Sequence, residues 1–234
     1  MKPTILIMSC EHASNIIPEE YQHLFLDDLP VLASHRTWDK SAQEITSYLS
    51  QLFECDYVLT RISHLIIDCN RSLAHNDCFS AYSRHLSEKD KQHLIDEFYL
   101  PYRQHVEKLI RKQIDNGNQV LHLSIHSFIP ELNGKVRNAA IGLLYDSSRH
   151  GEQEVARLWC GLLSAQKPAY RVRKNYPYRS HSNGLISSLR RKFCEEDYLG
   201  LEIECNQAIT ENTESLTQLQ HMLAHTLDEL LQLL

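Results

Sequence analysis

The chain has 234 residues, of which 42% are hydrophobic and 23% are charged, so it can bury a sizeable core. Its net charge of −6 argues against a nucleic-acid-binding surface. The apolar run near the N-terminus is too short for a signal peptide or a membrane span. The seven cysteines are odd in number and form no Cys-x-x-Cys pair, which favours reduced thiols. These features predict one cytoplasmic domain over residues 1–234 that binds neither nucleic acid nor membrane, and they leave its oligomeric state open.

Apolar runs and helical stripes alternate along the chain. Strands are predicted at residues 3–8, 57–60, 65–67, 119–125, 139–145, 170–173 and 199–203. Helices are predicted at residues 40–53, 87–115, 151–163 and 214–233. The second helix starts with the capping box Ser87-Glu-Lys-Asp90, and Pro101 is expected to break or kink it. The alternation predicts a single α/β domain with a largely parallel, possibly mixed sheet.

Polar clusters accompany four of the predicted strands. His12 follows the first strand, Asp68-Cys-Asn-Arg71 the third and His126-Ser127 the fourth, and Glu202 lies in the last. Ligands of open α/β sheets bind outside the carboxyl ends of the strands, so we expect these side chains to meet at one edge. Two histidines with carboxylates are what a catalytic zinc site requires. Zinc there would polarise a carbonyl and activate water, and a nearby carboxylate would move the proton.

Ordinary structural roles are open to the same residues. The spacing of the clusters matches no zinc motif, and His126 has the alternative of capping its strand within a hydrogen-bond network. Arg71 suits a substrate carboxylate, which it can bind through two parallel hydrogen bonds. Its alternative is an internal pair with Asp68 that holds the loop. Asp39 stands at the N-cap of the helix over residues 40–53, so capping is its structural alternative.

Six segments, in this order along the chain, resemble the N-formylglutamate amidohydrolase family. They are Cys10-Glu-His-Ala-Ser-Asn-Ile-Ile-Pro18, Trp38-Asp39, Asp68-Cys-Asn-Arg71, His126-Ser-Phe-Ile-Pro130, Asn175-Tyr-Pro-Tyr178 and Leu201-Glu-Ile203. The ordered set is specific, although no single segment is. The resemblance implies a phosphorylase/hydrolase-like fold, a three-layer αβα arrangement shared with the zinc exopeptidases. It also implies hydrolysis of the formyl amide of an N-formyl amino acid to formate and the free amine.

A more distant resemblance to zinc carboxypeptidases implies roles for single residues. Asn70 and Arg71 stand where those enzymes grip the substrate carboxylate with an Asn-Arg pair. His126 corresponds to the zinc-binding histidine of their His-Ser-Tyr, and Glu202 to the general base of their Phe-Glu-Leu-Arg. Glu204 shares a strand face with Glu202, since alternate residues point to the same side, so only the resemblance selects Glu202.

The third metal ligand has no counterpart in the expected motif. The first zinc motif of those carboxypeptidases is His-x-x-Glu, and this chain has His12-Ala-Ser-Asn15 instead. A neutral asparagine is a poor zinc ligand. The ligands are therefore expected to be His12, Asp39 and His126, with Glu11 as the alternative to Asp39.

The expected function is zinc-dependent removal of an N-formyl or small N-acyl group from an acidic amino acid such as N-formylglutamate. Arg137 or Tyr178 is expected to contact a second carboxylate if the substrate is glutamate-like. One alternative is a peptidase-like or other deacylase activity on a different acyl group. Another is a catalytically silent member that binds a small carboxylate ligand or a protein partner. Bound zinc would favour an enzyme over a binding protein.

Overall fold

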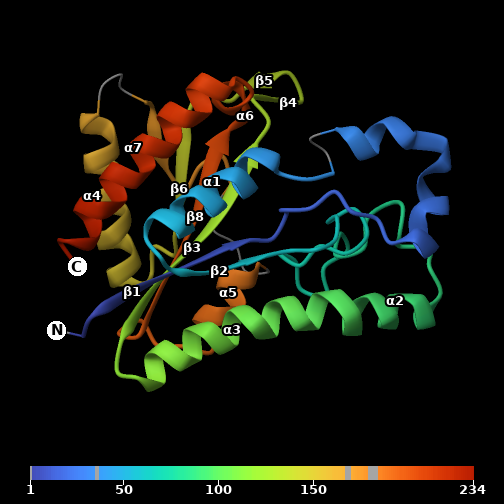
Figure 1. The fold of residues 1–234 in the computed structure, drawn as a ribbon, viewed down its shortest axis with the longest axis horizontal. Coiled ribbons are helices and arrows are strands. Elements are labelled where there is room, and N and C mark those ends of the chain that lie inside the picture. Colours follow the sequence, from blue (N-terminus) through green and yellow to red (C-terminus); the bar gives the residue numbers. More distant parts are fainter. Residues whose placement is uncertain (1, 35–36, 167–169, 179–183) are drawn as a thin grey trace.

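A six-stranded sheet in the order β2-β1-β3-β8-β6-β7 forms the centre of the molecule (Figure 1). The computed structural model describes residues 2–34, 37–166, 170–178 and 184–234. The strands are β1 Thr4–Cys10, β2 Asp56–Leu59, β3 Gln119–Phe128, β6 Ile141–Leu144, β7 Val172–Lys174 and β8 Tyr198–Asn206. Neighbouring strands are parallel except β6 and β8, which are antiparallel. The predicted α/β class and largely parallel, mixed sheet are confirmed; the single domain over residues 1–234 stays a prediction.

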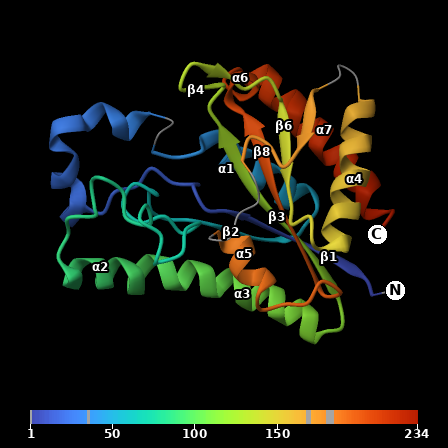
Figure 2. The ribbon, with the colours of Figure 1, turned by 180° about the vertical axis from the view of Figure 1, so that it is seen from behind.

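Helices cover both faces of the sheet (Figures 1 and 2). Helices α1 Lys40–Leu52, α4 His150–Ala165 and α7 Thr213–Leu231 pack on one face, and α3 Leu100–Asp115 and α5 Leu185–Arg190 on the other. The alternation of side chains along β3 explains this division, because Leu121 and Leu123 enter the first core while Val120 enters the second. The three-layer αβα arrangement is therefore confirmed.

The strand predicted at residues 65–67 is wrong. Ile66 and Ile67 are buried in the second core, but neither lies in a strand, and Ile66 belongs to a turn in which its amide donates to the carbonyl of Ser63 at 3.0 Å. The apolar run at residues 65–67 therefore belongs to a buried loop and not to a strand of the sheet. Strand β3 is also longer than predicted, so His126 lies inside the strand and not after it.

The helix predicted at residues 87–115 is one run of three parts. Helix α2, Glu88–Leu94, begins at Ser87, whose hydroxyl accepts from the Asp90 amide as predicted. A π-helical turn, η2 Ile95–Tyr99, leads into α3, and Pro101 lies in the first turn of α3. Proline lacks an N–H, and its ring clashes with the carbonyl four residues earlier. The wider π turn accommodates that ring, so the run continues past Pro101, where a break or a kink was predicted.

Several short elements have no counterpart among the predicted ones. They are the 3₁₀ segment η1 Glu19–Ala33, the hairpin of β4 Glu131–Leu132 and β5 Lys135–Val136, and the helices α5 and α6 Gln207–Thr210. The η1 segment and α2 form the end of the molecule that projects from the sheet (Figures 1 and 2). All seven cysteines are free. Among the described residues, no helix combines the length and apolarity needed to cross a bilayer.

Helix α5 is anchored at both ends. Arg190 at its C-terminal end pairs with Glu152 of α4, Nη2 to Oε2 at 2.8 Å. The Glu152 side chain is fully buried and also accepts from the Gly200 amide of β8. At the other end, the Leu185 amide donates to Asn70 Oδ1 at 2.9 Å. A helix this short is not stable by itself, so these contacts determine where it lies.

Strand β6 passes close to the segment after β7. A Cβ at Gly142 would lie 1.7 Å from the carbonyl oxygen of Tyr176. Gly142→Ala is expected to lower the free energy of unfolding by about 1–3 kcal/mol or more, because the backbone must move. Gly161→Ala in α4 is the control, since its Cβ would meet no atom within 4 Å; it should raise stability by about 0.5–1 kcal/mol. Urea unfolding measures both, and wild-type stability of the Gly142 variant would contradict the close approach.

Candidate active site

A cavity of about 400 Å³ opens at the carboxyl ends of β1, β3 and β8. Residues singled out from the sequence that line it are His12, Asp39, Asn70, Arg71, His126, Tyr178 and Glu202. Glu204 and His64 line it as well. The structure therefore brings together side chains from distant parts of the chain, as expected for a ligand site at a sheet edge.

His12, Asp39 and His126 offer three ligand atoms that lie within 4.8 Å of one another. Nδ1 of His12 lies 3.7 Å from Asp39 Oδ2, and Nδ1 of His126 lies 3.9 Å from the same oxygen. Tetrahedral bonds of about 2.0–2.1 Å would separate ligand atoms by roughly 3.3–3.4 Å. Small shifts would let all three bind one ion. The group suits a cation that takes imidazole and carboxylate ligands, such as zinc.

Carboxylates hold the outer nitrogens of both imidazoles. His12 Nε2 lies 2.9 Å from Asp68 Oδ1, and His126 Nε2 lies 3.1 Å from Glu11 Oε2. Each ring thereby directs Nδ1 toward Asp39, and such outer contacts fix ring orientation and tautomer in metal sites. Burial lowers the pKa of His126, but the neighbouring Glu11 carboxylate outweighs it and raises that pKa to about 9.

Glu11, the alternative third ligand, lies outside this group. Its side chain is fully buried. It accepts hydrogen bonds from Ser9 Oγ at 2.6 Å, from the Tyr102 hydroxyl at 3.1 Å and from Ser124 Oγ. Burial raises the pKa of the Glu11 carboxyl, but His126 and the hydroxyl donors hold it below its usual range. Glu11 contacts Nε2 of His126, whereas Asp39 lies nearest Nδ1.

The carboxylate of Asp39 does not cap α1. Asp39 occupies the N-cap position, but its side chain makes no capping hydrogen bond. Its Oδ2 instead accepts from the Ser127 amide of β3 at 3.1 Å, and its own amide donates to the His12 carbonyl at 2.8 Å. These contacts connect the start of α1 to both histidine-bearing segments.

Two glutamates of β8 face the cavity. Glu204 is in register with His126 on β3, and Glu202 is in register with Ser124. Glu204 is 5% exposed, and its Oε2 has no hydrogen-bond partner among the described residues. Burial raises the pKa of Glu204 to about 8 and also raises the pKa of Glu202. Carboxyl groups with raised pKa values are suited to accept and deliver protons near neutral pH.

Asn70 and Arg71 present hydrogen-bond donors to the cavity. Asn70 Oδ1 is occupied by the Leu185 amide, and its Nδ2 lies 3.4 Å from His126 Nε2. The Arg71 side chain is 48% exposed, with Nε 3.5 Å from Asp68 Oδ2. The internal Asp68–Arg71 contact therefore exists, and it leaves much of the guanidinium accessible. A loop that offers donors is suited to an anion such as a carboxylate.

Tyr178 reaches the cavity directly, whereas Arg137 stands beside it. Arg137 Nη1 donates to the Tyr178 hydroxyl at 3.1 Å, and its guanidinium carbon lies 5.0 Å from the centre of the Tyr178 ring. Tyr178 lines the cavity and is 46% exposed. A ligand in the cavity would therefore meet Arg137 at the rim, next to the tyrosine that it holds.

His64 lines the cavity although the sequence did not single it out. Its ring centre lies 4.4 Å from that of His12, and its Nδ1 is buried without a partner in the part of the chain that the structure describes. Burial, and then the charge of His12, lowers the pKa of His64 to about 4. His64 was missed in the sequence because a strand was predicted at residues 65–67, whereas a loop brings His64 to the cavity.

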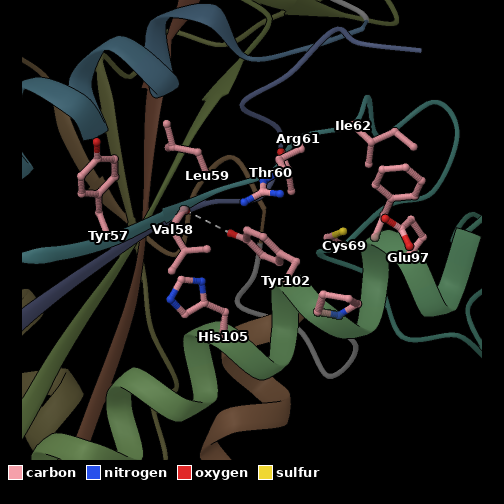
Figure 3. Close-up of a pocket in the computed structure, with 12 residues that line it drawn as sticks. Tyr57, Val58, Leu59, Thr60, Arg61, Ile62, Cys69, Glu97, Tyr102 and His105 are labelled. Carbon is pink, nitrogen blue, oxygen red and sulfur yellow. Dashed lines mark hydrogen bonds between the residues drawn. The ribbon is translucent and has the colours of Figure 1, made fainter. Parts of the chain in front are cut away.

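A second cavity, of about 380 Å³, lies between β2 and α3 (Figure 3). Tyr102 forms part of its wall, and the hydroxyl points toward the carbonyl of Val58, 3.5 Å away. The same hydroxyl reaches Glu11 behind the wall. The group of potential metal ligands found among the described residues lies in the first cavity. The first cavity is therefore the candidate active site.

Comparisons with known proteins point to one family. A family model described as N-formylglutamate amidohydrolase matches residues 4–210 of this chain. A comparison with curated proteins found no match.

Three solved structures share the fold. Gene product Atu2144 from Agrobacterium tumefaciens has a TM-score of 0.83 and 26% identity, over 99% of this chain and 91% of that chain. N-formylglutamate amidohydrolase from Ralstonia eutropha JMP134 has a TM-score of 0.71 and 16% identity, over 99% and 92%. N-acetylmuramoyl-L-alanine amidase from Clostridium difficile 630 has a TM-score of 0.51 and 14% identity, over 98% of each chain. The last two likenesses concern the fold alone.

Proposed function

The chain belongs to the N-formylglutamate amidohydrolase family, and from this premise we propose a zinc-dependent hydrolysis of N-acyl amino acids. The substrate class is an acidic amino acid carrying an N-formyl or other small N-acyl group, such as N-formylglutamate. The observation that carries the proposal is the meeting of His12, Asp39 and His126 in the cavity that also holds Arg71. A cavity of about 400 Å³ suits a small molecule of this kind.

The donor set fits zinc. Two imidazole nitrogens and a carboxylate oxygen are a common catalytic combination that leaves one position open. Zinc, when bound, would polarise the acyl carbonyl and lower the pKa of a water molecule. Asp68 and Glu11 hold the two histidines in the required orientation, and the Ser127 amide holds Asp39.

A glutamate of β8 takes the proton from the attacking water and passes it to the leaving nitrogen. The resemblance to zinc carboxypeptidases favours Glu202 as this base. Two observations support Glu204 as the alternative: its register with His126 and its buried, unpartnered Oε2.

The substrate carboxylate lies against Asn70 and Arg71. Because Asn70 Oδ1 is already bonded to Leu185, the pair offers N–H groups, which match a carboxylate. The Arg71 guanidinium can make the bidentate contact that gives such pairs their strength. Tyr178 and Arg137 at the rim are placed to contact a second carboxylate on a glutamate-like side chain.

Replacing one metal ligand tests the zinc site. His126→Ala is expected to lose zinc during dialysis and to lose hydrolysis of N-formylglutamate, because two ligands remain. His85→Ala is the control, since His85 is exposed, and it should keep both properties. Elemental analysis measures the metal and formate release measures the activity. Undiminished zinc in the His126 variant would remove His126 from the site.

Paired amide variants of the two glutamates identify the base. Glu202→Gln is expected to keep zinc and to lose about 10²–10⁴-fold in kcat, the usual contribution of general acid–base catalysis. Glu204→Gln is the matched comparison, because the two side chains share one strand face. Zinc content and kcat are measured for both. A large loss confined to Glu204→Gln would transfer the role to Glu204.

Arg71→Lys tests the substrate class. The variant keeps the charge but loses the planar fork, so KM for N-formylglutamate is expected to rise about 10-fold or more. An N-alkylformamide, which has no carboxylate, should be a poor substrate of the wild type and insensitive to the change. Steady-state kinetics on both compounds measure this. Equal cleavage of the two by the wild type would rule out carboxylate recognition by Arg71.

A further inference from the structure

We propose that Arg103 of α3 is a positioning residue for substrate recognition, because it holds the loop of Asn70 and Arg71 in the geometry that binds a carboxylate. The inference rests on the proposed function and deepens it. Arg103 acts from beneath the loop, on its main chain and on α5. It therefore works through Arg71 rather than on the substrate.

The guanidinium of Arg103 bridges two separate segments. Nη1 donates to the Cys69 carbonyl at 2.8 Å and lies 3.4 Å from the Arg71 carbonyl. Nη2 donates to Ser188 Oγ of α5 at 2.6 Å. Because the first amide of α5 already holds Asn70 Oδ1, these bonds close a ring of contacts around the loop.

Tyr99 supports the same carbonyl. Its hydroxyl donates to the Arg71 carbonyl at 2.8 Å, and its side chain is almost completely buried. The guanidinium carbon of Arg103 lies 5.1 Å from the centre of the Tyr99 ring, so the aromatic face also restrains the arginine. Both residues contact the backbone of Arg71, which leaves the Arg71 side chain directed to the cavity.

The chemistry of this contact requires arginine. A guanidinium presents planar donors that reach the carbonyl of Cys69 and the hydroxyl of Ser188 at once. A lysine ammonium at this position can donate to one of these two acceptors but cannot bridge both in a fixed geometry. A displacement of about 1 Å in a substrate clamp can cost up to about 100-fold in rate. Loss of the Arg103 contacts is therefore expected to weaken substrate recognition.

Kinetics of Arg103 variants test the proposal. Arg103→Met is expected to raise KM for N-formylglutamate roughly 10-fold and to leave zinc content unchanged. Arg103→Lys should recover part of this loss, and Tyr99→Phe should raise KM by less. Cleavage of an N-alkylformamide should change in none of them. Arg111→Met on the same helix is the control, because Arg111 is exposed and pairs with Glu107 at 2.9 Å.

A double-mutant cycle with Arg71→Lys distinguishes positioning from general destabilisation. If Arg103 acts through Arg71, Arg103→Met should add little to the KM of the Arg71→Lys protein. Additive effects, or an equal loss on the carboxylate-free amide, would overturn the inference. If Arg71→Lys itself leaves KM unchanged, the proposed substrate class fails instead.

Hydrogen exchange gives a readout that needs no turnover. The amides of Asn70, Arg71 and Leu185 should exchange faster in Arg103→Met than in wild type, while those of β3 stay unchanged. Wild-type exchange at all three amides would overturn the inference even if the enzyme proves inactive on every compound tried. The same measurement on Arg103→Lys serves if Arg103→Met does not fold.

Discussion

The buried carboxylate of Glu11 is the interaction on which the geometry of the cavity depends. An ion removed from water costs several kcal/mol unless its oxygens are fully hydrogen-bonded. Here the partners are Ser9 of β1, Ser124 and His126 of β3, and Tyr102 of α3. Two strands and a helix must therefore be docked before the carboxylate is satisfied. The orientation of His126 follows from that docking, so the site is assembled by the fold itself.

Polar contacts continue beneath the cavity along the same face of the sheet. His122 lies between Ser9 Oγ, 2.9 Å from Nε2, and the Tyr198 hydroxyl, 2.8 Å from Nδ1. Burial lowers the pKa of His122 to about 4, so it is a neutral link between β1, β3 and β8. A fully satisfied polar network of this kind favours one arrangement of the core, so it helps to hold the three strands in register. That register sets Glu204 beside His126.

The order of strands and helices is predictable from the sequence because it depends on local patterns. His12 and His126 were expected in one site for a similar reason, since both accompany the end of a buried strand. Loops are different. Ser63 donates to the carbonyl of Thr37, 26 positions earlier in the chain, and this contact helps to place His64 at the cavity. The buried hydrogen-bonding role of Glu11 was equally unpredictable, because its partner Tyr102 is 91 residues away. No local pattern contains those partners.

Helix α5 couples the loop of Asn70 and Arg71 to a distant part of the structure. Arg190 ties it to the buried Glu152 of α4, and its first amide holds Asn70. Warming that loosens α4 from the sheet would release this short helix and the loop with it. His12 and His126 depend on the central strands β1 and β3 instead. Under the proposed function, thermal inactivation would therefore begin as a loss of substrate affinity, at temperatures where the candidate metal ligands are still in place.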